Sequence, residues 1–93
     1  MKELDPLLHN QLRLSIMALL TQHDSITFSF IADKTGASRG NISVQLTNLE
    51  EAKYITINKS FVDKKPQTSA SITQKGEQAM EEYTNALKSY LDL

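Results

Sequence analysis

Cysteine is absent from this chain of 93 residues, so disulfides, thiolate metal sites and cysteine nucleophiles are excluded. No uninterrupted apolar stretch approaches the roughly 18 residues of a membrane span. Glu3, Asp5 and Pro6 precede the first apolar run, which is unlike a signal peptide. We therefore expect a protein that is neither exported nor inserted into a membrane, and a cytoplasmic location.

Motifs for catalysis and for cofactor binding are also missing. The sequence contains no Gly-x-Ser-x-Gly motif, no P-loop and no paired-carboxylate arrangement. Its two histidines, His9 and His23, are fourteen residues apart with no evident third ligand nearby, which is a weak basis for a metal site. The sequence thus predicts no enzyme activity, no metal site and no cofactor.

The length and composition indicate a single domain over residues 1–93. Hydrophobic residues make up 40% of the chain and charged residues 23%, as in a soluble globular domain. A chain this short buries roughly two thirds of the surface that its unfolded form exposes, so its stability is small. A partner subunit would add to it, and oligomerisation is a reasonable expectation.

The net charge of −1 argues against a nucleic-acid partner unless the positive charges are clustered. Residues 34–65 contain six basic and three acidic residues, an excess of +3, whereas the rest of the chain sums to −4. Starting the window at Asp33 lowers the excess to +2, so the asymmetry is suggestive and needs support from the fold.

The N-terminal residues predict a helix that begins at Asp5 and Pro6, a good N-cap followed by a good first-turn residue, and runs to about Gln22. Its apolar residues form two stripes on largely opposite faces. These are Leu8, Leu12, Ile16 and Leu19 on one face, and Leu7, Leu14, Met17 and Ala18 on the other. We expect the first stripe to pack inside the domain and the second to contact another long helix, from this chain or from a second copy.

A helix-turn-helix is predicted over residues 28–53. Residues 25–27 can add a short edge strand, residues 28–35 form a short helix, and Gly36 ends it. Ser38 is a good N-cap for a second helix, from Arg39 to about Lys53. Its inward face carries Ile42, Leu46, Leu49 and Ala52.

A wing over residues 54–73 and a last helix over residues 74–91 follow. Ile55, Ile57, Lys59 and Phe61 alternate with polar residues, which predicts a half-buried strand, and residues 68–73 form a second strand with Ile72 inward. Residues 63–67 form a loop with a basic tip, because Pro66 cannot donate a hydrogen bond to a sheet. Thr73 caps the last helix, which carries Met80, Tyr83, Leu87 and Tyr90 at helical spacing.

This order of elements resembles a winged helix-turn-helix of the MarR/ArsR kind. Five segments are similar to short stand-alone winged-helix transcriptional regulators of prokaryotes: Leu-Asp-Pro-Leu-Leu-His from residue 4, Arg-Leu-Ser-Ile-Met from residue 13, Ser-Arg-Gly-Asn-Ile-Ser from residue 38, Leu-Glu-Glu-Ala-Lys-Tyr-Ile from residue 49 and Lys-Ser-Phe-Val from residue 59. The resemblance spans nearly the whole chain. It implies an α+β, mostly helical fold with a long C-terminal dimerisation helix, and double-stranded DNA as the partner.

The resemblance also implies DNA contacts from the second helix of the helix-turn-helix and from the wing tip. These residues are Ser38, Arg39, Gly40, Asn41, Ser43, Val44 and Thr47 on the helix, and Lys64 and Lys65 on the wing. Members of the group commonly carry Gly-Arg-Arg-Pro at the wing tip, where this chain has Asp-Lys-Lys-Pro from residue 63. Asp63 subtracts a positive charge at the tip, and lysine lacks the planar guanidinium of arginine. Whether the wing enters the minor groove is therefore left open.

The residue types agree with this role. Small outward side chains let a helix approach the major groove, Arg39 and Asn41 suit guanine or adenine, and Val44 suits a thymine methyl. The free amides after Ser38 suit a phosphate. Each feature alone is also typical of an ordinary helix cap, a solvated charge or a soluble loop, and only their coincidence on one fold favours DNA binding. Gln45 lies nearer the core edge. Arg13 is expected either to pair with a carboxylate or a carbonyl, or to be exposed to solvent.

We therefore predict a sequence-specific DNA-binding transcriptional regulator, a repressor, that binds a roughly palindromic site as a homodimer. Its interface is expected on the first and last helices, from Leu7, Leu14, Met17, Met80, Tyr83, Leu87 and Tyr90. The alternative is a winged-helix adaptor that binds proteins and not DNA, which the negative net charge favours. The existence of a small-molecule effector is undetermined, and the cleft between the first and last helices is the place to look for one.

Overall fold

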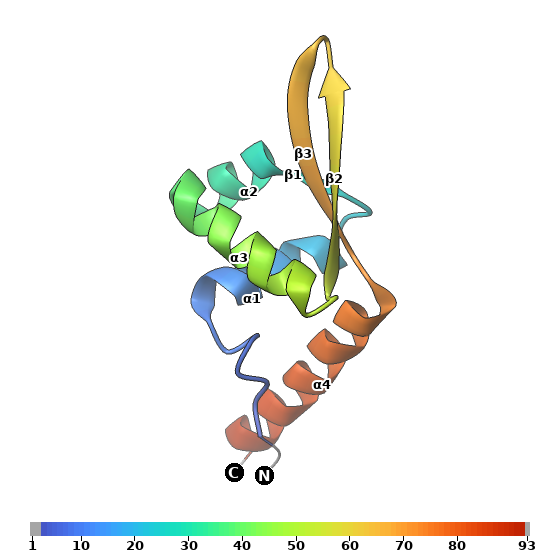
Figure 1. The fold of residues 1–93 in the computed structure, drawn as a ribbon. Helices are drawn as coiled ribbons and strands as arrows, with labels where there is room; N and C mark the ends of the chain where they lie inside the picture. The colour runs from blue at the N-terminus through green and yellow to red at the C-terminus, as the bar shows by residue number, and fades with distance from the viewer. Residues whose placement is uncertain (1–2, 93) are drawn as a thin grey trace.

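The computed structural model describes residues 3–92 and has the architecture of a winged helix. Its elements are α1 (Gln11–Thr21), β1 (Ile26–Thr27), α2 (Phe28–Thr35), α3 (Arg39–Glu51), β2 (Ile55–Val62), β3 (Lys65–Ile72) and α4 (Gln74–Leu91). Helices α1, α2 and α3 cluster together, the β2–β3 hairpin rises from them as a wing, and α4 leads away to the opposite end, where both termini lie (Figure 1). The predicted mostly helical α+β fold is confirmed.

One hydrophobic core joins the three clustered helices to the base of the wing. Its largest fully buried side chains come from the N-terminal segment, α1, α2, α3 and β2, and are Leu8, Ile16, Met17, Leu20, Ile31, Ile42, Leu49 and Ile55. Each such side chain contributes roughly 1.5–3 kcal/mol through removal from water. The core therefore fixes the position of α3 relative to the wing.

The first helix begins later than the sequence predicts. Asp5 does start a turn, since its side chain accepts a hydrogen bond from the Leu7 amide (2.9 Å) and its carbonyl accepts one from the His9 amide (2.9 Å). This turn does not continue. Asn10 then caps α1 by accepting from the Arg13 amide (3.0 Å). The prediction of one helix from residue 5 was wrong because Asp5 starts only a single turn and a second cap, Asn10, begins the helix five residues further on.

The later start changes the two predicted apolar stripes. Leu8 precedes α1, so it does not share the helical phase of Leu12 and Leu19, which are only half-buried. Met17, in the second stripe, is 0% exposed and lies in the core of a single chain. Its cover therefore comes from this chain, one of the two expected alternatives, and it needs no second copy to be buried.

The sheet is a three-stranded antiparallel sheet in the order β1-β3-β2. Its β2–β3 hairpin is longer than predicted, because Val62 pairs with Lys65 and Phe61 pairs with Pro66. Pro66 therefore lies in a strand and not in a loop. It is tolerated because β1 pairs with β3 only at Ser69 and Ala70, so the other side of β3 has no strand neighbour at Pro66.

Only the base of the wing is buried. Ile55 and Ala70 are 2% and 1% exposed, whereas Phe61 near the tip is 77% exposed. The expectation of a half-buried strand holds for its first residues and fails at Phe61, because the hairpin extends past the helices against which it could pack (Figure 1). Ile72 is half-buried and pairs with Ile55, in agreement with its predicted inward position.

The end of α3 and the start of α4 meet at one corner. Lys53 has a φ of 66°, and the Tyr54 amide donates to the Leu49 carbonyl (3.0 Å), which forms a Schellman motif with lysine where glycine is usual. Thr73 caps α4 by accepting from the Gly76 amide (3.0 Å), and its hydroxyl donates to the Lys53 carbonyl (2.7 Å). The corner thus ties the wing base to α4.

Two side-chain hydrogen bonds tie the N-terminal segment to the rest of the fold. The Tyr54 hydroxyl donates to an Asp5 carboxylate oxygen (2.6 Å), and His9 Nδ1 lies 3.0 Å from the Tyr83 hydroxyl. Burial, together with the bond to Asp5, raises the pKa of Tyr54 to about 12. The segment before α1 is therefore held by contacts with Tyr54, just before β2, and with α4. Over residues 3–92 no helix is long and apolar enough to cross a membrane.

Candidate nucleic-acid interface

The turn between α2 and α3 is fixed by local hydrogen bonds that the sequence encodes. Thr27 caps α2 by accepting from the Phe30 amide (3.1 Å), and Gly36 ends it in the left-handed region, with a φ of 69°. Ser38 then caps α3 by accepting from the Asn41 amide (3.2 Å). Gly36 and Ser38 are the helix stop and the cap that the sequence predicts, so the start of α3 is set by residues next to it.

Helix α3 buries one face and exposes the other. Ile42, Leu46 and Leu49 are at most 5% exposed and hold the helix against the core. The residues predicted to contact DNA all lie on the exposed side, and they are Ser38, Arg39, Gly40, Asn41, Ser43, Val44 and Thr47. The structure therefore brings the seven helix residues together on one solvent-facing surface, which we call the α3 face.

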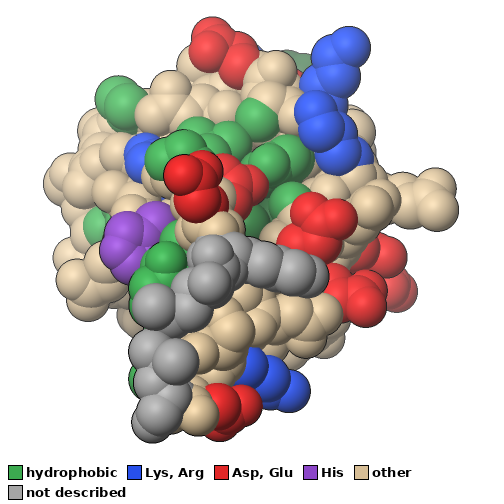
Figure 2. All heavy atoms as spheres, turned by 90° about the horizontal axis from the view of Figure 1, so that it is seen from below, with side chains coloured by type: hydrophobic (Ala, Val, Ile, Leu, Met, Phe, Trp, Pro, Cys, Tyr) green, Lys and Arg blue, Asp and Glu red, His purple; other side chains and the backbone are tan. Residues whose placement is uncertain are grey.

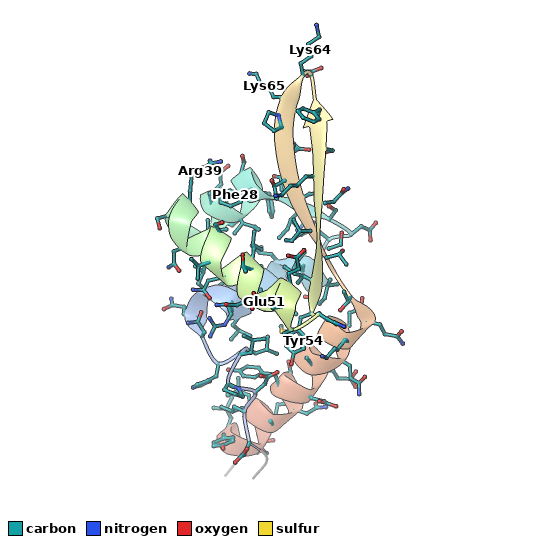
Figure 3. The ribbon with its side chains drawn as sticks, in the orientation of Figure 1. Phe28, Arg39, Glu51, Tyr54, Lys64 and Lys65 are labelled. Carbon is teal, nitrogen blue, oxygen red and sulfur yellow. The ribbon has the colours of Figure 1, made fainter. Side chains whose placement is uncertain are left out.

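Arg39 has a contact that sequence analysis did not identify. Its guanidinium carbon lies 4.8 Å from the centre of the Phe28 ring, in a cation–π arrangement (Figure 3). Phe28 begins the short helix predicted over residues 28–35, and no spacing rule links it to a residue on the next helix. The stack holds Arg39 at the edge of the α3 face, where the residue stays exposed to solvent.

The wing tip is a two-residue turn with lysine at its second position. Asp63 and Lys64 both have positive φ, at 52° and 66°, as a type I′ hairpin turn requires. Lys64 points away from the molecule, and Lys65 points toward the side of α2 and α3 (Figure 3). Lys65 and Arg39 both line an open cavity of about 590 Å³ between the wing and the helix-turn-helix. The wing thus adds positive charge beside the α3 face.

A chain of hydrogen bonds behind the α3 face was also only partly predicted. Arg13 Nε donates to the Leu7 carbonyl (2.5 Å), which confirms the expected carbonyl partner, and Arg13 Nη1 donates to Gln45 Oε1. Gln45 Nε2 in turn donates to Asn41 Oδ1 (3.0 Å). A residue of the first helix is therefore connected to a residue of the α3 face through Gln45.

The residues predicted for a dimer interface lie in different environments. Met17 and Tyr83, 0% and 5% exposed, belong to the core of one chain. Four others are half-buried against that core, namely Leu7, Leu14, Met80 and Leu87. Tyr90 is 40% exposed and is followed by Leu91 at 75%. Hydrophobic side chains with acidic neighbours are visible on this end of the molecule, at the opposite end from the wing (Figure 2).

The cavities differ from the expected cleft between the first and last helices. A cavity of about 340 Å³ lies between α4 and the N-terminal segment, with Asp5 and Tyr54 in its wall, and no residue of α1 lines it. A larger one of about 860 Å³ lies between α1 and the helix-turn-helix, lined by Leu12, Leu19 and Ala37 among others. Within residues 3–92 no three His, Asp or Glu side chains are grouped so as to hold a metal ion.

Residues 12–91 match the family described as the winged helix DNA-binding domain. The chain belongs to this family. It is also 31% identical over 71 residues to the protein MJ0432 of Methanocaldococcus jannaschii, a match that covers 76% of this chain and 77% of the relative. Sequence and fold therefore agree on a winged-helix DNA-binding protein.

Solved structures have the same fold. A transcriptional regulator homologue from Pyrococcus horikoshii has a TM-score of 0.86 and 28% identity, covering 92% of this chain and 85% of its own. PadR of Bacillus subtilis, solved in complex with operator DNA, has a TM-score of 0.72 and 17% identity, covering 88% of this chain and 58% of its own. At that identity the likeness to PadR establishes the fold alone.

Proposed function

We propose that this protein is a transcriptional regulator that binds a specific double-stranded DNA site as a homodimer. In this proposal each α3 face enters a major groove, and the wings contact the adjacent backbone. A transcriptional regulator homologue with the same fold over 85% of its length supports regulation of transcription as the biological role. Binding to chromosomal DNA would place the protein in the cytoplasm of a prokaryotic cell.

The observation that carries the proposal is the composition of the α3 face. Helix α3 is held by three buried side chains, and it turns toward solvent a set of residues that are small or carry hydrogen-bonding groups. Gly40 and Ser43 allow the helix backbone to come near base edges, and Arg39 flanks them with a guanidinium. The Ser38 oxygen accepts from Asn41, but its O–H remains able to donate to a phosphate.

The first test measures how affinity for DNA depends on salt. Duplexes selected by the protein from a random pool would be titrated by fluorescence anisotropy at several salt concentrations. Each phosphate neutralised by a lysine adds about 0.9 to the slope of log K against log salt, so Lys64→Ala with Lys65→Ala should lower the slope of a dimer by about 3.6. Arg39→Ala should weaken binding to the selected duplex further.

Lys88→Ala is the control, because it removes a lysine charge from α4, away from the wing and the α3 face. It should leave the slope unchanged. If the wild-type protein binds the selected duplex no better than an acidic control protein does, and Arg39→Ala with Lys64→Ala changes nothing, DNA binding is refuted and the adaptor function is favoured.

The homodimer is tested at the end of α4. Tyr90 and Leu91 are large, exposed hydrophobic residues in the last turn of a helix. Changing both to Asp should convert the dimer into monomers in sedimentation analysis and should lower DNA affinity without changing the fold. Val44→Asp, which also places an acid on an exposed hydrophobic position but on α3, should lower DNA affinity and leave the dimer intact. A wild-type monomer at all concentrations would contradict the proposal.

Repression is the proposed outcome of binding, because a dimer that covers a promoter excludes the polymerase. A reporter gene placed behind the selected duplex should be expressed less when the protein is present and should recover with Arg39→Ala. Higher expression in the presence of the protein would identify an activator instead.

A further inference from the structure

Asn41 has a defined orientation in the α3 face, and its orientation decides which base it suits. A side-chain amide can present its oxygen, an acceptor, or its NH2 group, a donor. The Asn41 Oδ1 atom accepts from Gln45 Nε2 (3.0 Å), and among residues 3–92 no group accepts from the Asn41 NH2. The group of Asn41 that has no partner within these residues is therefore its NH2 donor.

Arg13 sets the direction of the hydrogen bond between Gln45 and Asn41, because Arg13 itself donates to Gln45. A guanidinium has five N–H donors and no acceptor, so only the oxygen of Gln45 can face it. Asn48 Nδ2 also donates to Gln45 Oε1 (3.3 Å), which adds a second donor at the same atom. With its oxygen used in this way, Gln45 has only its NH2 group left to offer Asn41.

Arg13 is itself fixed from the side of the N-terminal segment. Its Nε donates to the Leu7 carbonyl (2.5 Å), and the guanidinium is half-buried between that segment and α3. The chain therefore runs in one direction, from Arg13 through Gln45 to Asn41, and reversing any link would place two donors or two acceptors face to face.

We propose that Arg13 and Gln45 are positioning residues that determine base specificity, by holding Asn41 with its NH2 group toward the major groove. The inference rests on the proposed binding of α3 to duplex DNA. In the major groove guanine presents two acceptors, O6 and N7, thymine presents one, O4, and cytosine presents only an amino donor. Adenine is contacted best by an amide that directs both its oxygen and its NH2 at the base, and here the Asn41 oxygen is directed at Gln45. Guanine, with two acceptors, is therefore the preferred base opposite Asn41, ahead of thymine with one.

Gln45→Glu tests the direction of the chain. A carboxylate still accepts from Arg13 and from Asn48, but it cannot donate to Asn41. Asn41 then turns to donate to Glu at position 45 and presents its oxygen to the groove. We expect the preference at one position of the selected sites to change from guanine toward cytosine or adenine, by roughly fivefold or more in relative affinity, the size of one hydrogen bond.

Three further variants separate positioning from direct contact. Arg13→Lys keeps a donor-only group at the start of the chain, so it should leave the preferred base unchanged. In Gln45→Glu with Asn41→Ala, the new preference should disappear. If it persists, the glutamate itself contacts the base and the inference is overturned. Asn48→Ala should have little effect, because Arg13 alone keeps the Gln45 oxygen engaged.

A measurement without DNA gives an independent result. In the wild-type protein the Gln45 NH2 protons should exchange slowly with solvent in NMR spectra and the Asn41 NH2 protons rapidly. In Gln45→Glu the Asn41 NH2 protons should become the slow ones. Selective duplex binding by both proteins with the same preferred base, or rapid exchange at Gln45 in the wild type, would overturn this inference alone. Absence of any selective duplex binding would instead refute the proposed function.

Discussion

Gly76 gives a prediction in which two physical effects have opposite signs. It lies in the first turn of α4, where alanine is the better helix former by about 1 kcal/mol, so propensity alone predicts that Gly76→Ala stabilises the protein. However, a Cβ atom at this position would lie 2.2 Å from the Tyr54 carbonyl oxygen and 2.9 Å from Ile72 Cγ1. The first of these is a backbone atom, so no rotamer change can remove the contact.

The size of the stability loss in Gly76→Ala depends on how far the backbone at the corner must shift. To reach even 3.0 Å, the start of α4 and the Tyr54 carbonyl must separate by about 0.8 Å. That shift strains the bonds at the corner, which include the Thr73 amide to the Tyr54 carbonyl (3.0 Å) and Lys75 Nζ to the Ala52 carbonyl (3.0 Å). Overpacking costs about 1–3 kcal/mol and each lost hydrogen bond about 1 kcal/mol. After subtraction of the helix gain, we expect a net loss of about 2–4 kcal/mol.

The assay is thermal and urea unfolding at one fixed protein concentration. A loss of this size lowers the melting temperature of a domain of about 90 residues by roughly 10–20 °C. Gly40→Ala is the matched control, because it also lies in the first turn of a helix and a Cβ there meets nothing within 4 Å. It should be neutral or slightly stabilising. If Gly76→Ala is as stable as the wild type, the close approach of α4 to Tyr54 is refuted.

Three further predictions concern single residues. Lys53→Gly should raise the free energy of unfolding by about 0.5–1 kcal/mol in urea titrations, because glycine adopts a φ of 66° without strain, and a decrease would argue against the Schellman motif. Because the pKa of Tyr54 is raised to about 12 by burial and by Asp5, its contribution to stability is complete below pH 10 and is lost between pH 10 and 12. The tyrosinate absorbance of Tyr54 is the difference between the wild type and Tyr54→Phe. This difference should titrate with a midpoint near pH 12, and a midpoint near pH 10 would contradict the raised pKa. Phe61→Ser should change stability by less than about 0.5 kcal/mol, since Phe61 is 77% exposed, and a larger loss would mean that the wing tip packs on the domain.

The elements that the sequence predicts best are those bounded by strong local signals. Helix α2 has the predicted bounds and ends at Gly36, and the predicted caps Ser38 and Thr73 begin α3 and α4. In each case the cap, the helix stop and the apolar period lie within a few residues of one another. Local hydrogen bonding is enough to fix such boundaries, so no tertiary information is needed.

The features that were not predicted depend on residues far apart in the sequence. Asp5 is paired with Tyr54 across 49 positions, and Arg13 reaches Gln45 across 32. Their side-chain types allow many partners, and only the packing of α1 on α3 selects one. The stack of Arg39 on Phe28 is of the same kind. The candidate site could thus be located from the sequence, but the contacts that orient its side chains could not.

The corner between α3, β2 and α4 also links the two ends of the molecule. The carbonyls of Ala52 and Lys53, which directly follow α3, accept hydrogen bonds from Lys75 in the first turn of α4 and from its cap, Thr73. Groups that would otherwise be unsatisfied at a helix end are therefore satisfied by the next helix, which fixes the angle between them. In the proposed dimer, α4 sets the separation of the two α3 faces, so this angle sets the spacing between half-sites. A flexible corner would let one dimer bind half-sites at several different spacings. At Gly76 a Cβ atom would lie 2.2 Å from the Tyr54 carbonyl oxygen, so the corner is tightly packed. We therefore expect the dimer to bind half-sites at a single spacing.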